Sequence, residues 1–444
     1  MRVIVSRGDR SKLPGIAWCF EFTARSVFLL LTVVACVSPS FAQEPEVNQG
    51  ISLVLANELR FDSNVLRQQI NPLSSRVWRF SSQLNYKLEQ GGSDLELTHN
   101  FEHNRYLDSA RDTYTNQVAR LNFTQALNST NRITVLAGLA KGYEPRGLGV
   151  TEGTSAQTAN SPTGLNIGDL GIRYQLGRDL AKIRLIADLG ITETDRDSAL
   201  IANDSRDHTT TTQGLQLLYK VGSRTNLVLE HQARKFDYAR TSQDETGNPL
   251  NLDSKDQRNS VGVNLEATAK TVGRVRVGKQ SRNFQWRQAV WEDDPPAVIE
   301  EAAQVAVQRR PDNRENSALY WELAAVWSPR TYSRFEINAQ TSTSESLVIG
   351  TFVRHKDIAL QWVHDWNARL RTQLDYAVGR DVYEGTSRED RRRVWGAKID
   401  YAYSRAVHAG YGYTDQHVNS SFRLSGFDRS MHYLFVNYRR EAEN

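Results

Sequence analysis

The chain has 444 residues, with 55 Lys or Arg, 51 Asp or Glu and a mean hydropathy of −0.55. Residues 1–42 hold a surplus of three positive charges, so the rest of the chain carries a formal charge of +1 rather than +4 and offers no basis for nucleic-acid binding. Both cysteines, Cys19 and Cys36, also lie in residues 1–42, which excludes Cys-based zinc sites, Fe–S clusters and thiol nucleophiles from residues 43–444.

The first 42 residues predict a signal peptide. A basic stretch precedes an apolar run at 27–37, which is too short to span a bilayer, and Ser40-Phe41-Ala42 fits a small-x-small cleavage site. We therefore expect a signal peptide at 1–42 and a mature domain at 43–444. Two alternatives stay open: the apolar run is a buried strand or helix, or Cys36 is lipidated at a lipobox-like Val33-Val34-Ala35.

The segment 76–89 shows the pattern that recurs through the mature chain. Every second residue from Trp78 to Leu88 is apolar or aromatic, apart from Ser82, and the alternate residues are polar or charged. A period of two predicts a β-strand whose two faces meet different surroundings. No segment of the mature chain approaches 18 consecutive apolar residues, so no transmembrane helix is predicted.

Eighteen such strands are predicted, with the count uncertain by two. They span 51–61, 76–89, 93–106, 114–127, 131–143, 165–176, 181–194, 209–221, 225–238, 257–269, 273–284, 315–327, 332–343, 351–364, 368–383, 391–404, 406–418 and 429–440. The connections alternate between short turns, such as 90–92 and 128–130, and long loops, such as 144–164 and 285–314. This asymmetry is typical of bacterial outer-membrane barrels, which have short periplasmic turns and longer extracellular loops.

The sequence therefore predicts an all-β, antiparallel transmembrane β-barrel of 16–18 strands with both termini on the turn side. A soluble sandwich does not sort its turns by length, and a propeller would show a repeat of about forty residues, which is absent. Trp78 and Trp395 are expected near the loop ends, and Trp327, Trp362 and Trp366 near the turn ends, as two interfacial belts. The strand 429–440 must close the ring on the first strand.

One long loop carries the signals of a helix. Asp293-Asp294-Pro295-Pro296 precedes residues 297–310, with acidic residues early, basic residues late and Pro311 after them. Two alternatives remain open: the helix folds into the barrel mouth as a gate, or it packs on neighbouring loops at the outer surface.

The polar face predicts a wet lumen with a wall of mixed charge. Such a wall argues against a pore selective for one sign of ion, and the simplest alternative is that these residues merely pair across strands. The residues expected to line the lumen are Arg79, Lys87, Glu96, Arg120, Arg173, Arg184, Asp188, Glu230, Arg234, Glu266, Arg274, Arg276, Glu336, Arg369, Arg371, Asp375, Lys398 and Asp400.

No catalytic, cofactor or metal site is predicted. His99 and His103 share a strand face but lie about 13 Å apart at 3.3 Å per residue, which is too far for one ion. The glycines at 138–149 lack the context of a phosphate loop, and neither a G-x-S-x-G nor an H-E-x-x-H motif occurs. A dispersed Ser/His/Asp site at the loop side, as in an outer-membrane enzyme, stays open as a minor alternative.

The end of the first strand resembles a known entry motif. Phe61, Asp62, Asn64, Val65 and Arg67 match the motif of the β-barrel porin-2 family of Gram-negative outer-membrane proteins, whereas Leu66 replaces the usual aromatic. The layout of residues 43–440 is similar to that family. The resemblance implies an outer-membrane barrel that exports exopolysaccharide together with a periplasmic polysaccharide-export protein, and it implies no catalytic residues.

We therefore expect an outer-membrane conduit, with exopolysaccharide as its substrate and no cofactor. A porin for small hydrophilic solutes is the alternative from the same class, an outer-membrane enzyme is the alternative from another class, and a barrel plugged throughout is a third. Outer-membrane lipid is the expected surrounding, and nucleic acid is not an expected partner.

Overall fold

The computed structural model describes residues 50–440 except 91, 154, 198–205, 240–241, 244–248, 251, 269, 285–315, 347–351 and 423. The predicted signal peptide at 1–42 and the predicted loop helix at 297–310 both lie outside these residues. Within the described part, no helix is long and apolar enough to cross a membrane. The helical elements found there are η1 (Ala110–Asp112), η2 (Gly149–Thr151) and α2 (Ser155–Thr158).

Eighteen long strands form one sheet in the described residues, and β10 (Ser242–Gln243) pairs with β11 (Pro249–Leu250) in a separate hairpin. The long strands are β1 (Gly50–Asp62), β2 (Ser75–Gln90), β3 (Ser93–Tyr106), β4 (Tyr114–Ala126), β5 (Asn131–Glu144), β6 (Thr163–Leu176), β7 (Ile183–Asp197), β8 (His208–Lys220), β9 (Thr225–Tyr238), β12 (Ser254–Thr268), β13 (Thr271–Phe284), β14 (Asn316–Arg330), β15 (Ser333–Glu345), β16 (Phe352–Asp365), β17 (Leu370–Tyr383), β18 (Glu389–Ala402), β19 (Val407–Ser420) and β20 (Phe427–Arg440).

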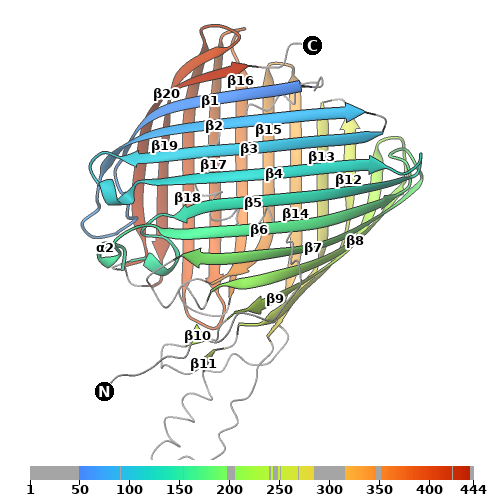
Figure 1. Ribbon diagram of the computed structural model, residues 1–444, viewed down its shortest axis with the longest axis horizontal. Helices are drawn as coiled ribbons and strands as arrows, with labels where there is room; N and C mark the ends of the chain where they lie inside the picture. Colours follow the sequence, from blue (N-terminus) through green and yellow to red (C-terminus); the bar gives the residue numbers. More distant parts are fainter. Residues whose placement is uncertain are drawn as a thin grey trace, which may run out of the picture.

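The sheet closes on itself as an antiparallel barrel (Figure 1). Each strand pairs with the next along the chain, β9 pairs with β12, and β20 pairs with β1 from Leu53↔Arg440 to Asp62↔Met431. Closure satisfies the backbone hydrogen bonds that an edge strand would leave open in hydrocarbon. The predicted fold class, strand number and closing pair are confirmed.

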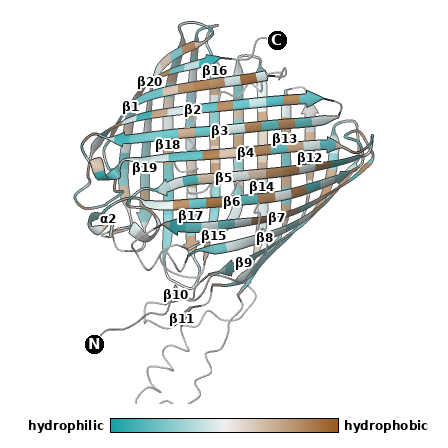
Figure 2. Ribbon diagram, in the orientation of Figure 1, coloured by the Kyte–Doolittle hydropathy of each residue, from teal (hydrophilic) through white to brown (hydrophobic). Residues whose placement is uncertain are grey.

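The two faces of each strand differ as the alternation predicts, and hydropathy alternates along the strands in Figure 2. On β2, Trp78, Leu84 and Leu88 are exposed on the outside, at 38%, 43% and 36%. Large exposed apolar side chains continue at alternate positions around the barrel. Such a surface is stable against lipid and would be costly in water.

The barrel has a turn end and a loop end. Tight turns close the turn end, such as the one in which the Leu127 amide donates to the Asn131 carbonyl (2.9 Å). At the turn before β7, Gly177 has a φ of +102°, and a Cβ there would lie 2.7 Å from the Ile183 carbonyl oxygen, so glycine is required. The register places the start of β1 and the end of β20 at the turn end.

Aromatic side chains gather near both ends of the outer face. At the turn end of β14–β16, the rings of Trp327 and Phe335 stack at 5.2 Å, and those of Phe335 and Trp362 at 6.1 Å. Near the loop end of β2, the Trp78 ring packs against His103 at 6.1 Å, whereas Trp395, which was expected near a loop end, lies in the middle of β18. Amphipathic rings at two levels fit two interfaces between membrane and water.

Candidate functional site

The lumen is identified by contacts that skip a strand. The Arg392 Nη2 of β18 donates to Asp357 Oδ1 of β16 (2.7 Å), across β17. The Gln280 Nε2 of β13 donates to Thr343 Oγ1 of β15 (2.8 Å), across β14. Side chains of non-adjacent strands converge only on the concave side of a closed sheet, so the polar face lines the interior.

The strand registers place the predicted lumen residues on this inner face, with two exceptions. Glu266 lies on β12, but its side chain is outside the described residues. Arg369 was expected on a strand and instead lies exposed in the turn before β17. The Asn367 side-chain oxygen accepts the backbone amides of Arg369 (2.8 Å) and Leu370 (3.0 Å), and this side-chain turn makes the strand begin at Leu370.

Arginine–carboxylate pairs recur along the inner wall. Several predicted lumen residues take part. Their partners lie two residues away on the same strand, on a neighbouring strand, or in the turn before β7. The pairs are Arg79–Glu102, Lys87–Glu89 (2.7 Å), Arg173–Asp188 (2.7 Å), Arg184–Asp179 (3.3 Å), Arg234–Asp256 (2.6 Å), Arg258–Glu230 (2.5 Å), Arg274–Glu322 (2.6 Å), Arg334–Glu336, Arg371–Asp365 (2.5 Å) and Lys398–Asp400 (4.0 Å). The wall is therefore polar and locally neutralised, without a ring of one sign among these pairs.

Glycines on the inner wall make room for these side chains to lie flat. A Cβ on Gly138 would lie 2.2 Å from Asp169 Oδ2 and 2.3 Å from Oδ1, so the carboxylate covers the glycine. Gly138 stands opposite Arg120 on the adjacent strand, which places an acid and a base in one row. The glycine therefore lets the Asp169 carboxylate lie against the wall beside Arg120.

The residues of the entry motif fix the start of the first loop. Phe61 points outward and is 49% exposed, whereas Asp62 is buried and forms a bidentate ion pair with Arg429 of β20. The Asn64 Nδ2 donates to the carbonyl oxygens of Gln68 (2.8 Å) and Asp428 (2.9 Å). The motif thus ties the β1–β2 loop to the seam where the barrel closes.

The later part of the entry motif, Val65 to Arg67, is buried at the loop end of the barrel. Val65 and Leu66 pack with Val77, Tyr106 and Ala156 in an apolar cluster on the lumen side of β2 and β3. An aliphatic Leu66 fills this position in place of the aromatic of the family pattern. Arg67, next along the loop, has a φ of 52°, and its burial lowers its pKa to about 10.

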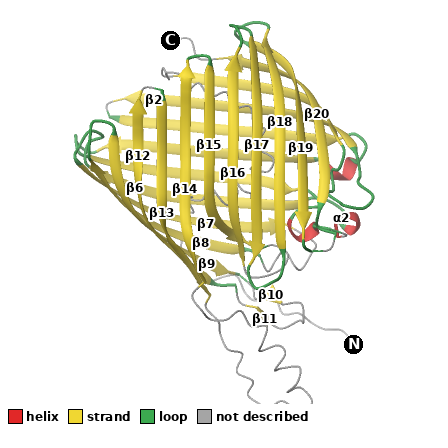
Figure 3. Cartoon of the chain, turned by 180° about the vertical axis from the view of Figure 1, so that it is seen from behind, coloured by secondary structure: helices red, strands yellow, loops and turns green. Residues whose placement is uncertain are grey.

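The β5–β6 loop, residues 145–162, crosses the mouth, and we call it the strap. The buried Arg146 anchors its first part, with Nε and Nη2 each 2.6 Å from the Asp112 carboxylate. A second contact joins the strap to the opposite side of the mouth. Arg388 Nη2 in the β17–β18 loop lies 2.5 Å from Glu152 Oε1, although the two residues are 236 positions apart in sequence. Gln68 also donates to the Gly153 carbonyl (3.0 Å). Figure 3 shows α2 of the strap at the loop end, near β19.

The strap contact is itself an ion-pair network. Arg388 also donates to Asp390 (2.5 Å) and lies 4.1 Å from the centre of the Tyr383 ring. Desolvation by burial lowers the pKa of Arg388, but the hydrogen bonds to Asp390 and the charge of Glu152 outweigh it and raise the pKa, so Arg388 stays charged. Sequence reasoning missed this network, because nothing local in residues 145–162 signals a partner on the far side of the barrel.

His99 and His103 both lie on the outer face. The His103 Nδ1 lies 2.8 Å from Thr115 Oγ1, and its ring packs against Trp78. Among the described residues, no group of three or more His, Cys, Asp or Glu side chains has a geometry that could hold a metal ion.

No protein-family model and no curated protein sequence matches the chain. Similar solved structures include the outer membrane protein opdK from Pseudomonas aeruginosa (12% identity, 88% of this chain and 98% of that chain, TM-score 0.45) and OccAB3 from Acinetobacter baumannii (11%, 88% and 98%, 0.42). The FrpB iron transporter from Neisseria meningitidis is a third (10%, 89% and 83%, 0.45). Likenesses at these identities and TM-scores carry no conclusion about substrate.

Proposed function

We propose that this protein is a porin-type channel through which small hydrophilic solutes cross a bacterial outer membrane passively. The observation that carries the proposal is a closed barrel with an apolar outer face and an inner wall of paired charges. Outer-membrane barrels place their short turns in the periplasm, so the turn end faces the periplasm and the loop end faces outward. Passive passage needs no catalytic residue, only water and many weak polar contacts along the wall.

The strap favours small solutes over a polymer. It joins Asp112 on one side of the mouth to Arg388 on the other, so a chain leaving the barrel would have to pass beside a fixed segment. Export of an exopolysaccharide, with a periplasmic export protein as partner, stays a prediction. Small molecules can pass around the strap without its release.

Liposome swelling tests the proposal. The full-length barrel is reconstituted, and swelling is followed in sugars and oligosaccharides of increasing size. We expect rapid swelling with monosaccharides and a steep fall as the solute grows. Absence of swelling with every solute would overturn the channel proposal, and equal rates for long oligosaccharides would favour polymer export.

A deletion strain separates the same two functions in the cell. Slower uptake of small solutes with unchanged surface polysaccharide supports the porin function. Loss of surface polysaccharide with unchanged uptake contradicts it.

A further inference from the structure

Three side chains on neighbouring strands near the loop end form a chain of hydrogen bonds. Ser344 lies near the end of β15, His355 near the start of β16 and Asp381 near the end of β17. The Ser344 Oγ lies 2.7 Å from His355 Nε2, and His355 Nδ1 lies 2.6 Å from Asp381 Oδ1. The serine and the aspartate thus bond to opposite nitrogens of the ring, which is the order of the triad in serine hydrolases.

This chain of hydrogen bonds faces the lumen. Asp357 lies two residues beyond His355 on the same face of β16, and it bonds to Arg392 across β17 (2.7 Å), on the concave side of the sheet. The side chains of His355 and Asp381 are only 8% and 9% exposed, whereas Ser344 is half-buried. Ser344 is therefore the most open of the three residues to a solute in the lumen.

The contacts of His355 determine which ring nitrogen carries the proton. A carboxylate accepts hydrogen bonds and does not donate them, so Nδ1 donates to Asp381 and Nε2 of the neutral ring is an acceptor. The Ser344 hydroxyl donates to Nε2, since the Glu345 carbonyl oxygen lies farther from it, at 3.3 Å. His355 is therefore placed to take the proton of Ser344 as a general base.

The charges beside the ring favour its protonated form. The Arg392 guanidinium is shared between Asp357 (2.7 Å) and Asp381 (2.6 Å), so these two carboxylates exceed it by one negative charge. A Cβ on Gly379 would lie 2.6 Å from Asp357 Oδ1 and 2.7 Å from Arg392 Nη2, so this glycine makes room for the shared contact. The surplus negative charge stabilises the imidazolium that forms when His355 takes a proton.

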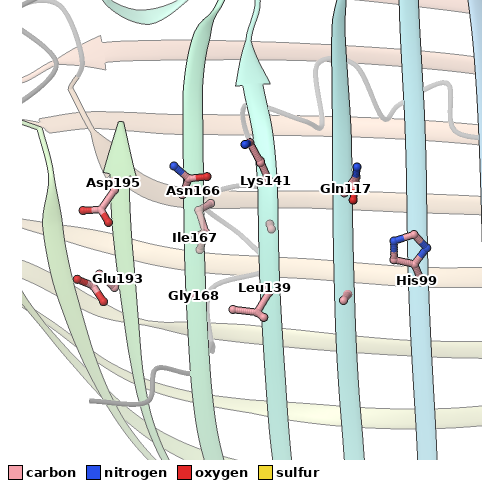
Figure 4. Close-up of a pocket in the computed structure, with 11 residues that line it drawn as sticks. His99, Gln117, Leu139, Lys141, Asn166, Ile167, Gly168, Glu193 and Asp195 are labelled. Carbon is pink, nitrogen blue, oxygen red and sulfur yellow. The ribbon is translucent and has the colours of Figure 1, made fainter. Parts of the chain in front are cut away.

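A hollow on the outer wall shows what the ordered bonds of His355 add. The hollow, of about 380 Å³, lies across β3–β7, with His99 on one side and the carboxylates of Glu193 and Asp195 on the other (Figure 4). Among the described residues that line it, there is no serine. A histidine and two acids in one hollow therefore supply no activated nucleophile, whereas the chain from Ser344 to Asp381 does.

We propose that Ser344, His355 and Asp381 hydrolyse carboxylic esters of small hydrophilic molecules that enter the lumen. The Ser344 Oγ attacks the ester carbonyl carbon while its proton passes to His355 Nε2, and that proton then goes to the oxygen of the leaving alcohol. Water attacks the acyl–Ser344 ester next, and its proton passes through Nε2 to Ser344 Oγ as the carboxylic acid leaves. Asp381 is a positioning residue that holds the ring, and Arg392 holds Asp381.

Labelling of the purified full-length barrel with a fluorophosphonate tests the proposal, and hydrolysis of para-nitrophenyl acetate is the second readout. Wild type should be labelled at Ser344, as located by mass spectrometry, and Ser344→Ala should lose both the label and the hydrolysis. His355→Gln should slow both by about 10² to 10⁴-fold, the usual contribution of a general base. Asp381→Asn should lower the maximal rate at an unchanged half-saturating ester concentration, because Asp381 does not touch the ester.

Ser342→Ala is the matched control. Ser342 lies directly opposite His355 in the register, but its hydroxyl has no hydrogen-bond partner within the described part of the chain. Labelling and hydrolysis should therefore stay as in wild type. Every variant is first shown to migrate as a folded barrel in unheated gel electrophoresis.

A folded wild type that is neither labelled nor faster in hydrolysis than Ser344→Ala would overturn the proposal. A label that persists in Ser344→Ala, or that disappears in Ser342→Ala, would overturn it too. Liposome swelling should be the same for all variants. Loss of hydrolysis with intact swelling leaves the channel function standing, and hydrolysis by a barrel that never swells liposomes refutes the channel function only.

Discussion

The inner wall and the outer face of the barrel are built from opposite types of side chain. On the inner wall, arginines such as Arg173 and Arg234 are held by carboxylates on neighbouring strands. On the outer face of β2, Trp78, Leu84 and Leu88 are exposed instead, and large apolar side chains continue around the barrel. Pairing keeps the lumen weakly selective, because the two charges of each pair largely cancel for a passing solute, whereas the apolar outer face suits contact with lipid. The difference suggests that paired charges mark the path of the solute and that exposed apolar side chains mark the surface in contact with lipid.

The largest effect is expected where a buried lumen pair is broken. Arg429→Ala leaves the Asp62 carboxylate buried without its cation and should lower the free energy of unfolding by about 3–5 kcal/mol. Urea unfolding in micelles, followed by tryptophan fluorescence, measures it. The double variant Asp62→Asn/Arg429→Gln is the control, and its free energy of unfolding should fall by less than that of Arg429→Ala. An unchanged midpoint for Arg429→Ala would show that the seam does not depend on this pair.

A smaller loss of stability is expected where a substitution adds a side chain in a closely packed place on the inner wall. Gly138→Ala puts a Cβ 2.2 Å from Asp169 Oδ2 and should cost about 1–3 kcal/mol, because the carboxylate must leave its place over the glycine. Adding Asp169→Ala should recover much of that loss. Gly222→Ala, where nothing lies within 4 Å of the new Cβ, is the matched control, and an equal effect there would refute the packing argument.

Releasing the strap should affect conduction more than stability. Glu152→Ala removes one charge-assisted bond to Arg388 and should make strap opening easier by about 1.5 kcal/mol, since Arg388 keeps Asp390. We expect a higher single-channel conductance, measured in planar bilayers. The control is Glu389→Ala, which breaks an exposed pair with Arg380 at the loop end. Unchanged conductance in Glu152→Ala would mean that the strap does not narrow the path.

The smallest effect is expected for an exposed pair. Hydrogen bonds from Arg76 lower the pKa of Asp108 to about 2 from its usual 3.8, so its contribution is present above pH 3.8 and is lost as the pH falls through 2. Both side chains are open to water, so Asp108→Asn should leave the unfolding midpoint at pH 7 unchanged within error. A shift as large as that of Arg429→Ala would remove the distinction between buried and exposed pairs.

The sequence was sufficient for the features set by local chemistry. Period-two patterning and the lengths of the turns predict the barrel, its two ends and the face on which residues such as Arg173 and Lys398 lie. The strand after the turn at Asn367 was predicted to begin at residue 368, two residues too early, because a side-chain hydrogen bond, rather than hydropathy, sets the start of β17.

Features that depend on distant partners were not predictable. The Glu152–Arg388 contact joins residues 236 positions apart, and the Asp62–Arg429 pair joins residues 367 apart. Asp62 was noted only as part of a family motif, and its structural role became visible once β20 closed on β1.

The central claim is a water-filled path lined by paired charges, and recordings of the purified full-length barrel in planar bilayers test it most directly. Under a tenfold salt gradient, we predict stepwise conductance with a reversal potential near zero, as expected for a wall without a net sign. A barrel that never conducts would contradict the open lumen. A reversal potential close to the limit for one ion would contradict the neutralised wall.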